Sequence, residues 1–508
     1  MGYIRNVSKI LFRKKFLIVL FVCGLLTLLK FFEVLNLNAN KQSNTLMNLH
    51  WLIYNFKKSV SFAVKILTSS PRSDIPTNIY IENDHWQILN TTHEPIKILN
   101  AYFDTRDYYQ QKNQSIVKFI VMIKAGTTHP KIHCKHWFND ESETKFSSIH
   151  NFLRLWPNMW GWGINKNGSI PYLLSCLNPL HSLRKIPSSV SLVLNQEDMP
   201  TNYFKVIYNL PQSGEKKLVA VCTKLLDYKD DISLMIIEWM EIQLLFGAEK
   251  IIFHIMDVHP NILKTLKYYQ SIGKVQIELI KWPIGVKKIG EYHLQGIQNQ
   301  FVMLCDCLYK NMYEYSYLAV LDTDELIVPV RSQDRTFYDL LSREFRKHRH
   351  PKSVSGFATK AVFYLFDNNH QGEIQPEVPE DFQFLQHIYR SKKIANYDQG
   401  PKSFQSTELV EVIGTHRTYS CLGVGFDCKR ITIDANDARM HHYRKGCPDN
   451  IVKSCDELRN ITLKDKTLWK YKNEIIEKVY KTIRCLKLFI NWMYPLAIKR
   501  MTLTYIDV

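Results

Sequence analysis

Between Lys217 and Pro329 the chain alternates short apolar runs with longer amphipathic segments, and this alternation limits the possible folds more than any other feature. The short runs have the length of buried strands, and the longer segments space their apolar residues as helices do. The predicted strands are Leu218–Thr223, Ile251–Met256, Val275–Ile280 and Tyr317–Leu321, and the predicted helices are Ile232–Phe246, Pro260–Ile272 and His293–Met312. Strands that alternate with helices are joined by right-handed crossovers. We therefore predict an α/β domain with a Rossmann-like, mostly parallel sheet.

An acidic motif, Asp322-Thr323-Asp324-Glu325, follows the fourth predicted strand and is the only D-x-D in the chain. Ligands of such sheets bind outside the carboxyl ends of the strands. Two carboxylates two residues apart on an extended segment can approach one cation, and their hard oxygens suit Mn²⁺ or Mg²⁺. A cation there can bridge a diphosphate and neutralise its charge. The alternative is an acidic surface turn, but the position after a buried strand favours the metal site.

The N-terminus indicates the compartment. Basic residues from Arg5 to Lys15 precede an uninterrupted apolar run, Phe16–Leu29, and apolar residues continue past Lys30. The positive-inside rule then places the N-terminus in the cytosol and the rest of the chain in the lumen. No small-x-small cleavage site follows the run, which favours an uncleaved signal anchor. A cleaved signal peptide and a buried core helix are the alternatives.

Glycosylation sequons and cysteines support an oxidising lumen. Four N-x-S/T sequons begin at Asn90, Asn113, Asn167 and Asn460. Ten of the eleven cysteines lie beyond the apolar run, an even number that permits up to five disulfides. Cys421 with Cys428 and Cys447 with Cys455 are close enough in sequence to form local pairs.

The formal net charge of +18 favours anionic partners such as nucleic acid, anionic lipid or phosphate-bearing small molecules. A nucleic-acid partner requires a cytosolic or nuclear domain. The predicted lumenal placement therefore excludes nucleic acid and favours a phosphate-bearing substrate and a membrane.

Several motifs together resemble glycosyltransferase family 92, a group once labelled as a domain of unknown function. They are Glu238-Trp239, Leu245-Phe246-Gly247-Ala248, Ile251–Met256 with Asp257, Leu321–Ile327 with Pro329, and His441-His442-Tyr443-Arg444. The resemblance covers roughly residues 96 to 465. It implies a GT-A type fold and a type II Golgi membrane enzyme. Such an enzyme moves a sugar, often galactose, from a nucleotide donor such as a UDP-sugar to a glycan acceptor on a glycoprotein or glycolipid.

The resemblance also implies roles for individual residues. Asp322 and Asp324 would hold Mn²⁺ (or Mg²⁺), with His442 completing the metal shell; a partly buried structural histidine is the alternative for His442. The residues expected to bind the nucleotide sugar are Thr223, Lys224, Asp257, Asp322 and Asp324. His416 is a weaker candidate for a site residue. Trp239 is expected to pack in the core, and Glu238 to cap or brace the sheet.

An inverting reaction requires a carboxylate that accepts the proton of the acceptor hydroxyl. Glu408 and Glu411 are candidate catalytic residues for this role, and so are the acids between Asp367 and Asp381. Alternation along a strand places Glu408 and Glu411 on opposite faces, so at most one of them can serve. The sequence leaves the choice open.

These observations divide the chain into six parts: residues 1–15 as a cytosolic tail, 16–35 as a signal-anchor transmembrane helix, 36–95 as a stem, 96–215 as a small β-rich region, 216–465 as the glycosyltransferase domain and 466–508 as a helical extension. The main alternative function is a catalytically inactive, lectin-like lumenal protein on the same fold. The intact D-x-D and the late histidine favour an enzyme over that alternative.

Overall fold

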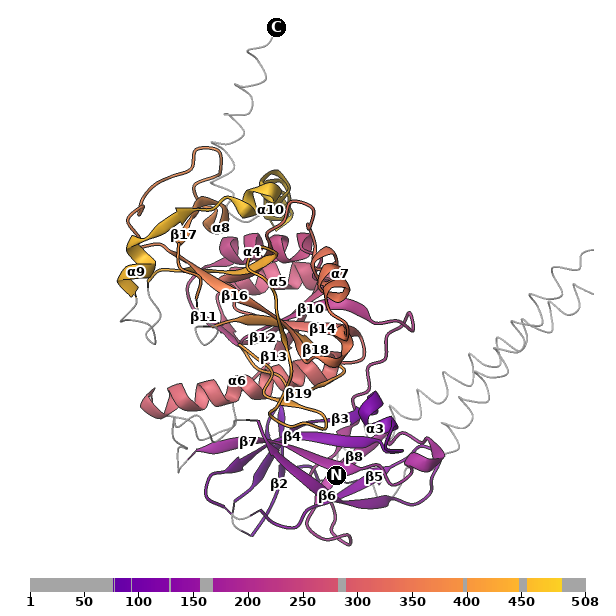
Figure 1. Cartoon of the computed structure of the whole chain (residues 1–508). Coiled ribbons are helices and arrows are strands. Elements are labelled where there is room, and N and C mark those ends of the chain that lie inside the picture. The colour runs from indigo at the N-terminus through magenta and orange to yellow at the C-terminus, as the bar shows by residue number, and fades with distance from the viewer. Residues whose placement is uncertain are drawn as a thin grey trace, which may run out of the picture. The chain divides into compact units, whose positions relative to one another are not determined.

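The computed structural model describes residues 76–486, except residues 77, 93, 128, 156–167, 282–288, 396–399 and 447–454, and the side chains of residues 289–298 and 455. The described residues belong to one unit, Pro76–Val508, and contain two large β-sheets (Figure 1). The predicted tail, signal anchor and most of the stem lie outside the described residues. No helix among the described residues is both long and apolar enough to span a membrane.

The first sheet contains nine strands in the order β1-β2-β3-β4-β7-β6-β5-β8-β9. Its strands are β1 (Ile81–Asn83), β2 (Trp86–Leu89), β3 (Ile96–Asp104), β4 (Ile116–Lys124), β5 (His133–Trp137), β6 (Lys145–Arg154), β7 (Ser169–Leu177), β8 (Ser189–Val193) and β9 (Phe204–Lys205). Every neighbouring pair is antiparallel. Most connections here carry no crossover helix, and antiparallel pairing needs none. The short helix α3 (Asp107–Gln110) and a 3₁₀ turn, His181–Leu183, lie between strands.

The second sheet is mixed and follows the order β11-β12-β10-β14-β18-β16-β22-β15, with β13 beside β12 and β21 beside β16. Its strands are β10 (Lys217–Thr223), β11 (Leu226–Tyr228), β12 (Lys250–Val258), β13 (Val275–Leu279), β14 (Tyr315–Leu321), β15 (Glu325–Pro329), β16 (Gly356–Leu365), β18 (Lys402–Ser406), β21 (Ile431–Thr432) and β22 (Ala438–Arg444). Two small pairs complete the strands: β17 (Tyr389–Ser391) with β23 (Thr462–Lys464), and β19 (Val410–Val412) with β20 (Ser420–Cys421).

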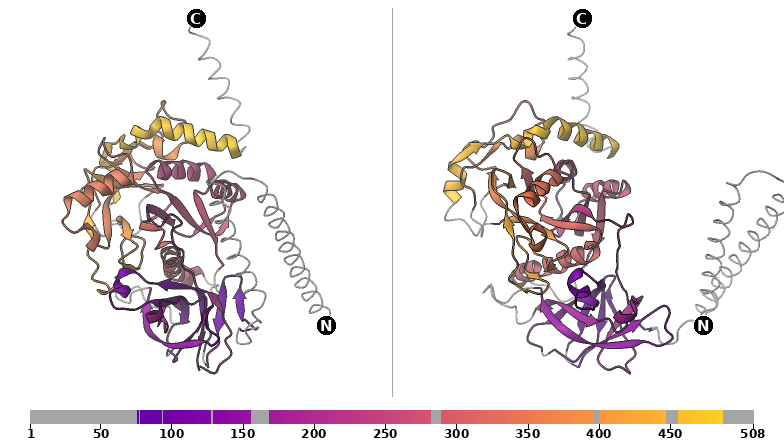
Figure 2. Two further views of the ribbon diagram at one scale, coloured as in Figure 1. Left: turned by 90° about the vertical axis from the view of Figure 1, so that its right-hand side faces the viewer. Right: turned by 45° about the vertical axis from the view of Figure 1, so that its right-hand side comes forward.

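Helices cover both faces of the second sheet. They are α4 (Ser233–Leu245), α5 (Pro260–Ser271), α6 (Ile289–Asn311), α7 (Phe337–Lys347), α8 (Gln383–Gln386), α9 (Cys455–Asn460) and α10 (Lys472–Leu486), with 3₁₀ turns at Pro351–Ser353 and Thr467–Tyr471. Helices α4 and α5 share a core with Val219, Val221 and Phe253, whereas α6 packs against Cys222 and Ile252 on the opposite face. Alternation along β10 and β12 sends neighbouring side chains to opposite faces, which explains the two cores. Helix α10 packs along α4 (Figure 2).

The predicted fold class is wrong. Parallel pairing holds for β11, β12, β13, β10 and β14, where helices α4, α5 and α6 make three of the four connections, and for β16 with β21 and β22. However, β18 runs antiparallel to β14 and β16, and β15 runs antiparallel to β22. The first sheet is also a full nine-stranded sheet instead of a small β-rich region. Antiparallel pairings therefore predominate in the described residues, because the crossover rule covers only strands connected by helices. The membrane anchor included in that prediction, residues 16–35, lies outside the described residues.

A group of buried charges joins the first sheet to the second part of the chain. Arg106 forms an ion pair with Asp104 at 2.7 Å and donates hydrogen bonds to the backbone carbonyls of Thr407 and Val410. Lys118, on β4, forms an ion pair with Glu411 at 2.6 Å. A buried charge is stable only when it is paired, so these contacts fix the position of the first sheet.

Three disulfides lie in the described part of the chain. They join Cys134 to Cys176, Cys222 to Cys307, and Cys421 to Cys428. The predicted local pair Cys421–Cys428 is confirmed. The predicted pair of Cys447 with Cys455 lies outside the described residues and side chains. Cys305 and Cys485 are free thiols.

Candidate metal and donor site

The D-x-D motif forms the turn between β14 and β15. Strand β15 begins at Glu325 and pairs with β22 so that Glu325 lies opposite His442. The backbone N–H of Tyr443 donates to the carbonyl of Asp324 at 2.9 Å, and the Trp239 indole donates to the carbonyl of Glu325 at 2.8 Å. Trp239 is fully buried, as expected for a core residue, and its hydrogen bond also fixes the start of β15.

Asp324, Glu325 and His442 form the group that fits a metal ion. One ligand atom from each side chain lies within 4.8 Å of the other two. The Nε2 atom of His442 is 3.5 Å from Asp324 Oδ2, and its Nδ1 atom is 3.7 Å from Glu325 Oε1. Two carboxylates and an imidazole are a donor set that suits Mn²⁺. The ring of Phe363 stacks on that of His442 with centroids 5.5 Å apart, which holds the imidazole in place.

Two lysines meet the carboxylates of the motif. Lys224 forms an ion pair with Asp322. The fully buried Lys402 lies 2.7 Å from Glu325 Oε2 and 3.7 Å from Asp322 Oδ2. Burial raises the pKa of Asp322, but Lys224 and Lys402 lower that pKa by more, so it lies below its ordinary value. Burial likewise raises the pKa of Glu325, and Lys402 lowers it to a net value below the ordinary one. Both carboxylates are therefore ionised at neutral pH.

The charges of this group do not cancel. Three carboxylates face two ammonium groups, and Asp324 has no lysine partner among the described residues. Asp324 is also the most exposed of the three carboxylates, with 36% of its side chain accessible. An excess negative charge at an accessible carboxylate attracts a cation.

The other predicted donor-binding residues lie in different surroundings. Lys224 is part of the charge group, as described above. The side chain of Thr223 is buried at the end of β10, and its hydroxyl lies 3.3 Å from the carbonyl of Ile252. Asp257 is exposed near the end of β12, where it forms an ion pair with Lys229. The fold therefore brings Lys224 to the motif and leaves Asp257 with a surface partner.

The candidate bases Glu408 and Glu411 lie near the opposite end of β14. Because β18 runs antiparallel to β14, Ser406 pairs with Tyr317, and Thr407 donates from its N–H to the carbonyl of Ser316. Glu408 follows and contacts Lys216, while Glu411 contacts Lys118 at the junction of the two sheets. The length of β14, about 20 Å at roughly 3.3 Å per residue, separates this end from Asp322.

Glu238 and Asp367, two further acids named from the sequence, both contact other segments of the chain. The carboxylate of Glu238 accepts hydrogen bonds from the backbone N–H groups of Gln383, Phe384 and Leu385, so it braces the start of α8. Asp367 follows β16 and forms an ion pair with Arg459 at 2.7 Å.

Sequence reasoning missed several residues of the site. Glu325 and Lys402 belong to the charge group, and Tyr228 lies near Thr323 with its ring half-exposed. Glu325 is adjacent to the D-x-D, so its position was a usable signal. His416 lies near Lys402. Burial first, and then the charge of Lys402, lower the pKa of His416 to about 4. A buried lysine such as Lys402 has no sequence signal that separates it from a surface lysine.

Three of the predicted glycosylation sites are on the surface. Asn90, Asn113 and Asn460 are exposed, and Asn167 lies outside the described residues. Exposure is required for a glycan, so these three positions are available for modification.

The comparison with known families agrees with the site. No curated protein matches the chain. The sequence model of glycosyltransferase family 92 matches residues 217–479, more than half of the chain, and spans the D-x-D turn, Lys402 and His442. This chain belongs to glycosyltransferase family 92.

Proposed function

We propose that the protein is a metal-dependent glycosyltransferase that moves a hexose, with galactose as the first candidate, from a UDP-sugar to a glycan on a glycoprotein or glycolipid. Family membership supports the transferase class. The observation that carries the metal and donor proposal is the arrangement of Asp324, Glu325 and His442 around one point at the edge of β14 and β15.

In this proposal Asp324, Glu325 and His442 hold Mn²⁺, with Mg²⁺ as the alternative. When bound, the metal neutralises the charge that develops on the leaving diphosphate. Asp322 keeps Lys224 at the same edge through their ion pair, and the Lys224 ammonium can then meet a phosphate oxygen. Buried Lys402 holds the Glu325 carboxylate, and Trp239 fixes the backbone beneath it. The half-exposed ring of Tyr228 is a surface on which the base of the donor can stack.

The catalytic base is not assigned to Glu408 or Glu411. Both carboxylates contact lysines near the far end of β14, so neither can reach a hydroxyl at the D-x-D turn in this structure. A lectin-like protein on the same fold is the second candidate function. The excess negative charge and open position of Asp324 favour the enzyme, because binding of a neutral glycan does not require such a site.

The test is a screen of purified full-length protein for UDP release. UDP-galactose, UDP-glucose, UDP-N-acetylglucosamine and UDP-N-acetylgalactosamine are each offered with Mn²⁺ and a mixture of neutral glycans. We expect one donor to give acceptor-dependent UDP release that excess chelator abolishes and Mn²⁺ restores. Full release in excess chelator would refute metal dependence. Absence of transfer with every donor, together with intact glycan binding, would favour the lectin-like alternative.

We further propose that the protein resides in the Golgi membrane as a single-pass type II protein with its catalytic part in the lumen. The exposed positions of Asn90, Asn113 and Asn460 support this placement, since a lumenal chain can carry glycans there. Treatment of the expressed chain with a glycan-removing amidase should lower its apparent mass. A variant that lacks all four sequons is the control, and its mass should not change. An unchanged mass of the wild-type chain would contradict a lumenal location.

A further inference from the structure

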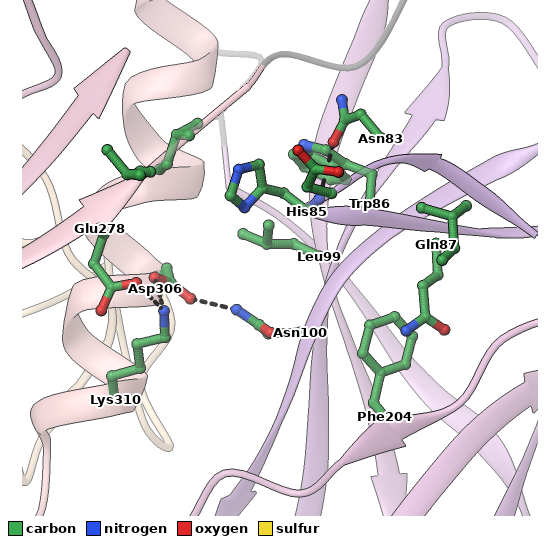
Figure 3. Close-up of a pocket in the computed structure, with 14 residues that line it drawn as sticks. Asn83, His85, Trp86, Gln87, Leu99, Asn100, Phe204, Glu278, Asp306 and Lys310 are labelled. Atoms are coloured by element: carbon green, nitrogen blue, oxygen red, sulfur yellow. Dashed lines mark hydrogen bonds and ion pairs between the residues drawn. The ribbon is translucent and has the colours of Figure 1, made fainter. Parts of the chain in front are cut away.

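A cavity of about 290 Å³ lies between the first sheet and the second, away from the D-x-D turn. Figure 3 shows that its walls come from both parts of the chain: β1, β2 and β3 on one side, and the end of β13 and helix α6 on the other. The volume is near the lower end of ligand pockets, on the order of 300 Å³, and suits one ring-sized group better than a nucleotide.

The charge of the cavity disfavours anionic ligands. Asp84, Glu278 and Asp306 line it together with Lys310, and Lys281 pairs with Asp84 at 2.6 Å, so three carboxylates face two ammonium groups. Lys310 is already bound, because its Nζ lies 2.8 Å from Glu278 Oε2 and 2.8 Å from Asp306 Oδ2 (Figure 3). In a chain with a net charge of +18, this cavity is locally negative. A phosphate, a sulfate or a sialic acid would meet repulsion here, whereas an uncharged ligand would not.

The remaining lining groups match a sugar ring. Asn100 donates an amide N–H to Asp306 at 2.9 Å and keeps its side-chain carbonyl oxygen as a hydrogen-bond acceptor. His85 lines the same cavity, and an imidazole offers a donor and an acceptor to a hydroxyl group. Ile81 and Leu279 form an apolar rim, although 63% and 59% of their surfaces are exposed to solvent. Sugar rings combine hydroxyl groups with apolar C–H faces, so they use both kinds of contact.

The cavity lies on the face of the second sheet that α6 covers, and the D-x-D turn follows the end of β14 in the same sheet. Cys222 pairs with Val320 on one side and Ile252 on the other, and His254 pairs with Glu278. Side chains alternate along strands, so His254 and Glu278 point to the face covered by α6, whereas Asp322 and Lys224 follow the ends of β14 and β10. Strand β13 lies three strands from β14, which corresponds to about 14 Å at 4.8 Å per strand. This separation matches the reach of a short oligosaccharide.

We propose that this cavity binds an uncharged sugar unit of the acceptor glycan, a few units away from the unit that receives the transferred sugar. The proposal rests on the proposed function in one respect, that the bound glycan is the acceptor of the transfer reaction. Binding of a neutral glycan in the cavity is measurable without transfer. It assigns the first sheet a role in acceptor selection, because Asn100, His85 and Ile81 all belong to that part of the chain.

Direct binding gives the first test. Saturation-transfer NMR and calorimetry on the metal-free full-length protein would use neutral tetrasaccharides ending in galactose, N-acetylglucosamine, mannose or fucose, and the same glycans carrying sialic acid. We expect at least one neutral glycan to bind. His85→Ala and Leu279→Ser should weaken it at least about tenfold, and a sialic acid placed on the bound unit should abolish binding. Ile272→Ser is the matched control, because Ile272 is 52% exposed and lies outside the cavity.

Kinetics separate this proposal from the proposed function. In an active enzyme, His85→Ala and Leu279→Ser should raise the KM for the tetrasaccharide and leave the donor KM and the rate with a monosaccharide acceptor unchanged. Glycan binding without transfer would refute the proposed function and leave the cavity proposal standing. Transfer with wild-type binding and wild-type acceptor KM in both variants would refute the cavity proposal alone. Absence of binding by every neutral glycan, or tighter binding of the sialylated forms, would also refute it.

Discussion

Two groups of charged side chains in this protein differ in their net charge and in their exposure to solvent. At the junction of the sheets, Asp104 and Glu411 face Arg106 and Lys118, so the charges cancel, and the side chains of Asp104, Arg106 and Lys118 are fully buried. At the D-x-D turn three carboxylates face two lysines, and Asp324 is open to solvent. The charges of the first group neutralise one another, whereas the second group keeps an excess negative charge that a ligand can neutralise.

The net charge of a group and its exposure separate structural from functional ionisable residues better than the direction of a pKa shift does. The pKa values of both Asp104 and Asp322 lie below their ordinary value, in each case because neighbouring cations outweigh the effect of burial. What differs is the net charge of the group and the access to it. We therefore expect substitutions at the junction to affect stability, and substitution of Asp324, which has no lysine partner among the described residues, to affect transfer with little effect on stability.

The largest expected effect is on catalysis. Asp324→Ala should lower the Mn²⁺-dependent transfer rate at least about a thousandfold, since metal charge stabilisation amounts to several kcal/mol of barrier and about 1.4 kcal/mol is tenfold in rate. Asp322→Ala removes the partner of Lys224 but no metal ligand, so it should lower the rate even at saturating Mn²⁺. The measurement is the rate against Mn²⁺ concentration, with circular dichroism to check the fold. Glu143→Ala is the matched control, because it removes an 82% exposed carboxylate far from the turn in sequence. A wild-type rate in Asp324→Ala would show that this residue does not hold a catalytic cation.

The next effect is on stability at the junction. Asp104→Asn leaves Arg106 buried without its charged partner, and breaking a buried pair in this way costs about 3–5 kcal/mol. Denaturant unfolding at pH 7 should show this loss, and Asp456→Asn, which changes a 90% exposed carboxylate, should show almost none. A loss below about 1 kcal/mol for Asp104→Asn would mean that the junction is not held by this ion pair.

The pH dependence of the same variant sharpens the comparison. Burial raises the pKa of Asp104, but Arg106 lowers it by more, so the folded-state pKa is below the unfolded value of about 3.9. The stabilisation by the Asp104 carboxylate is then fully present above about pH 4 and is lost as the pH falls through the folded-state pKa. The difference in unfolding free energy between wild type and Asp104→Asn should stay constant from pH 8 to about pH 5 and narrow below about pH 4. A difference that already narrows between pH 8 and pH 6 would contradict this assignment.

The local part of this architecture was predictable from the sequence. The strands and helices from Lys217 to Leu321 lie close to their predicted positions, and the D-x-D follows the fourth strand of that run. Apolar periodicity over a few residues determines such elements. The same periodicity places Asp322 and Lys224 directly after predicted strands, which is why the sequence indicated both residues. The structure shows that these two strands are adjacent and parallel.

Strand direction was not predictable. The alternation of side chains along residues 402–412 indicates which residues share a face of a strand. It does not indicate that β18 runs antiparallel to β14. This strand direction carries Glu408 to the end of the sheet away from Asp322. Likewise, Lys402 meets Glu325 only because β18 begins at the edge where β14 ends. Pairings between segments far apart in sequence decide both outcomes, and no local pattern encodes them.

The smallest expected effect is at His442, and it tests whether the open group acts as a metal shell. His442→Ala removes one of three ligands and leaves both carboxylates, so we expect a ten- to a hundredfold weaker apparent affinity for Mn²⁺, by analogy with the loss of one partner of a metal shell. Saturating Mn²⁺ should restore most of the rate, which distinguishes loss of a ligand from loss of structure. Phe363→Leu, which removes the ring stacked on His442 but no ligand, is the matched comparison and should have a smaller effect in the same direction. An unchanged Mn²⁺ dependence in His442→Ala would assign the imidazole to packing against Phe363 and leave the metal to the carboxylates alone.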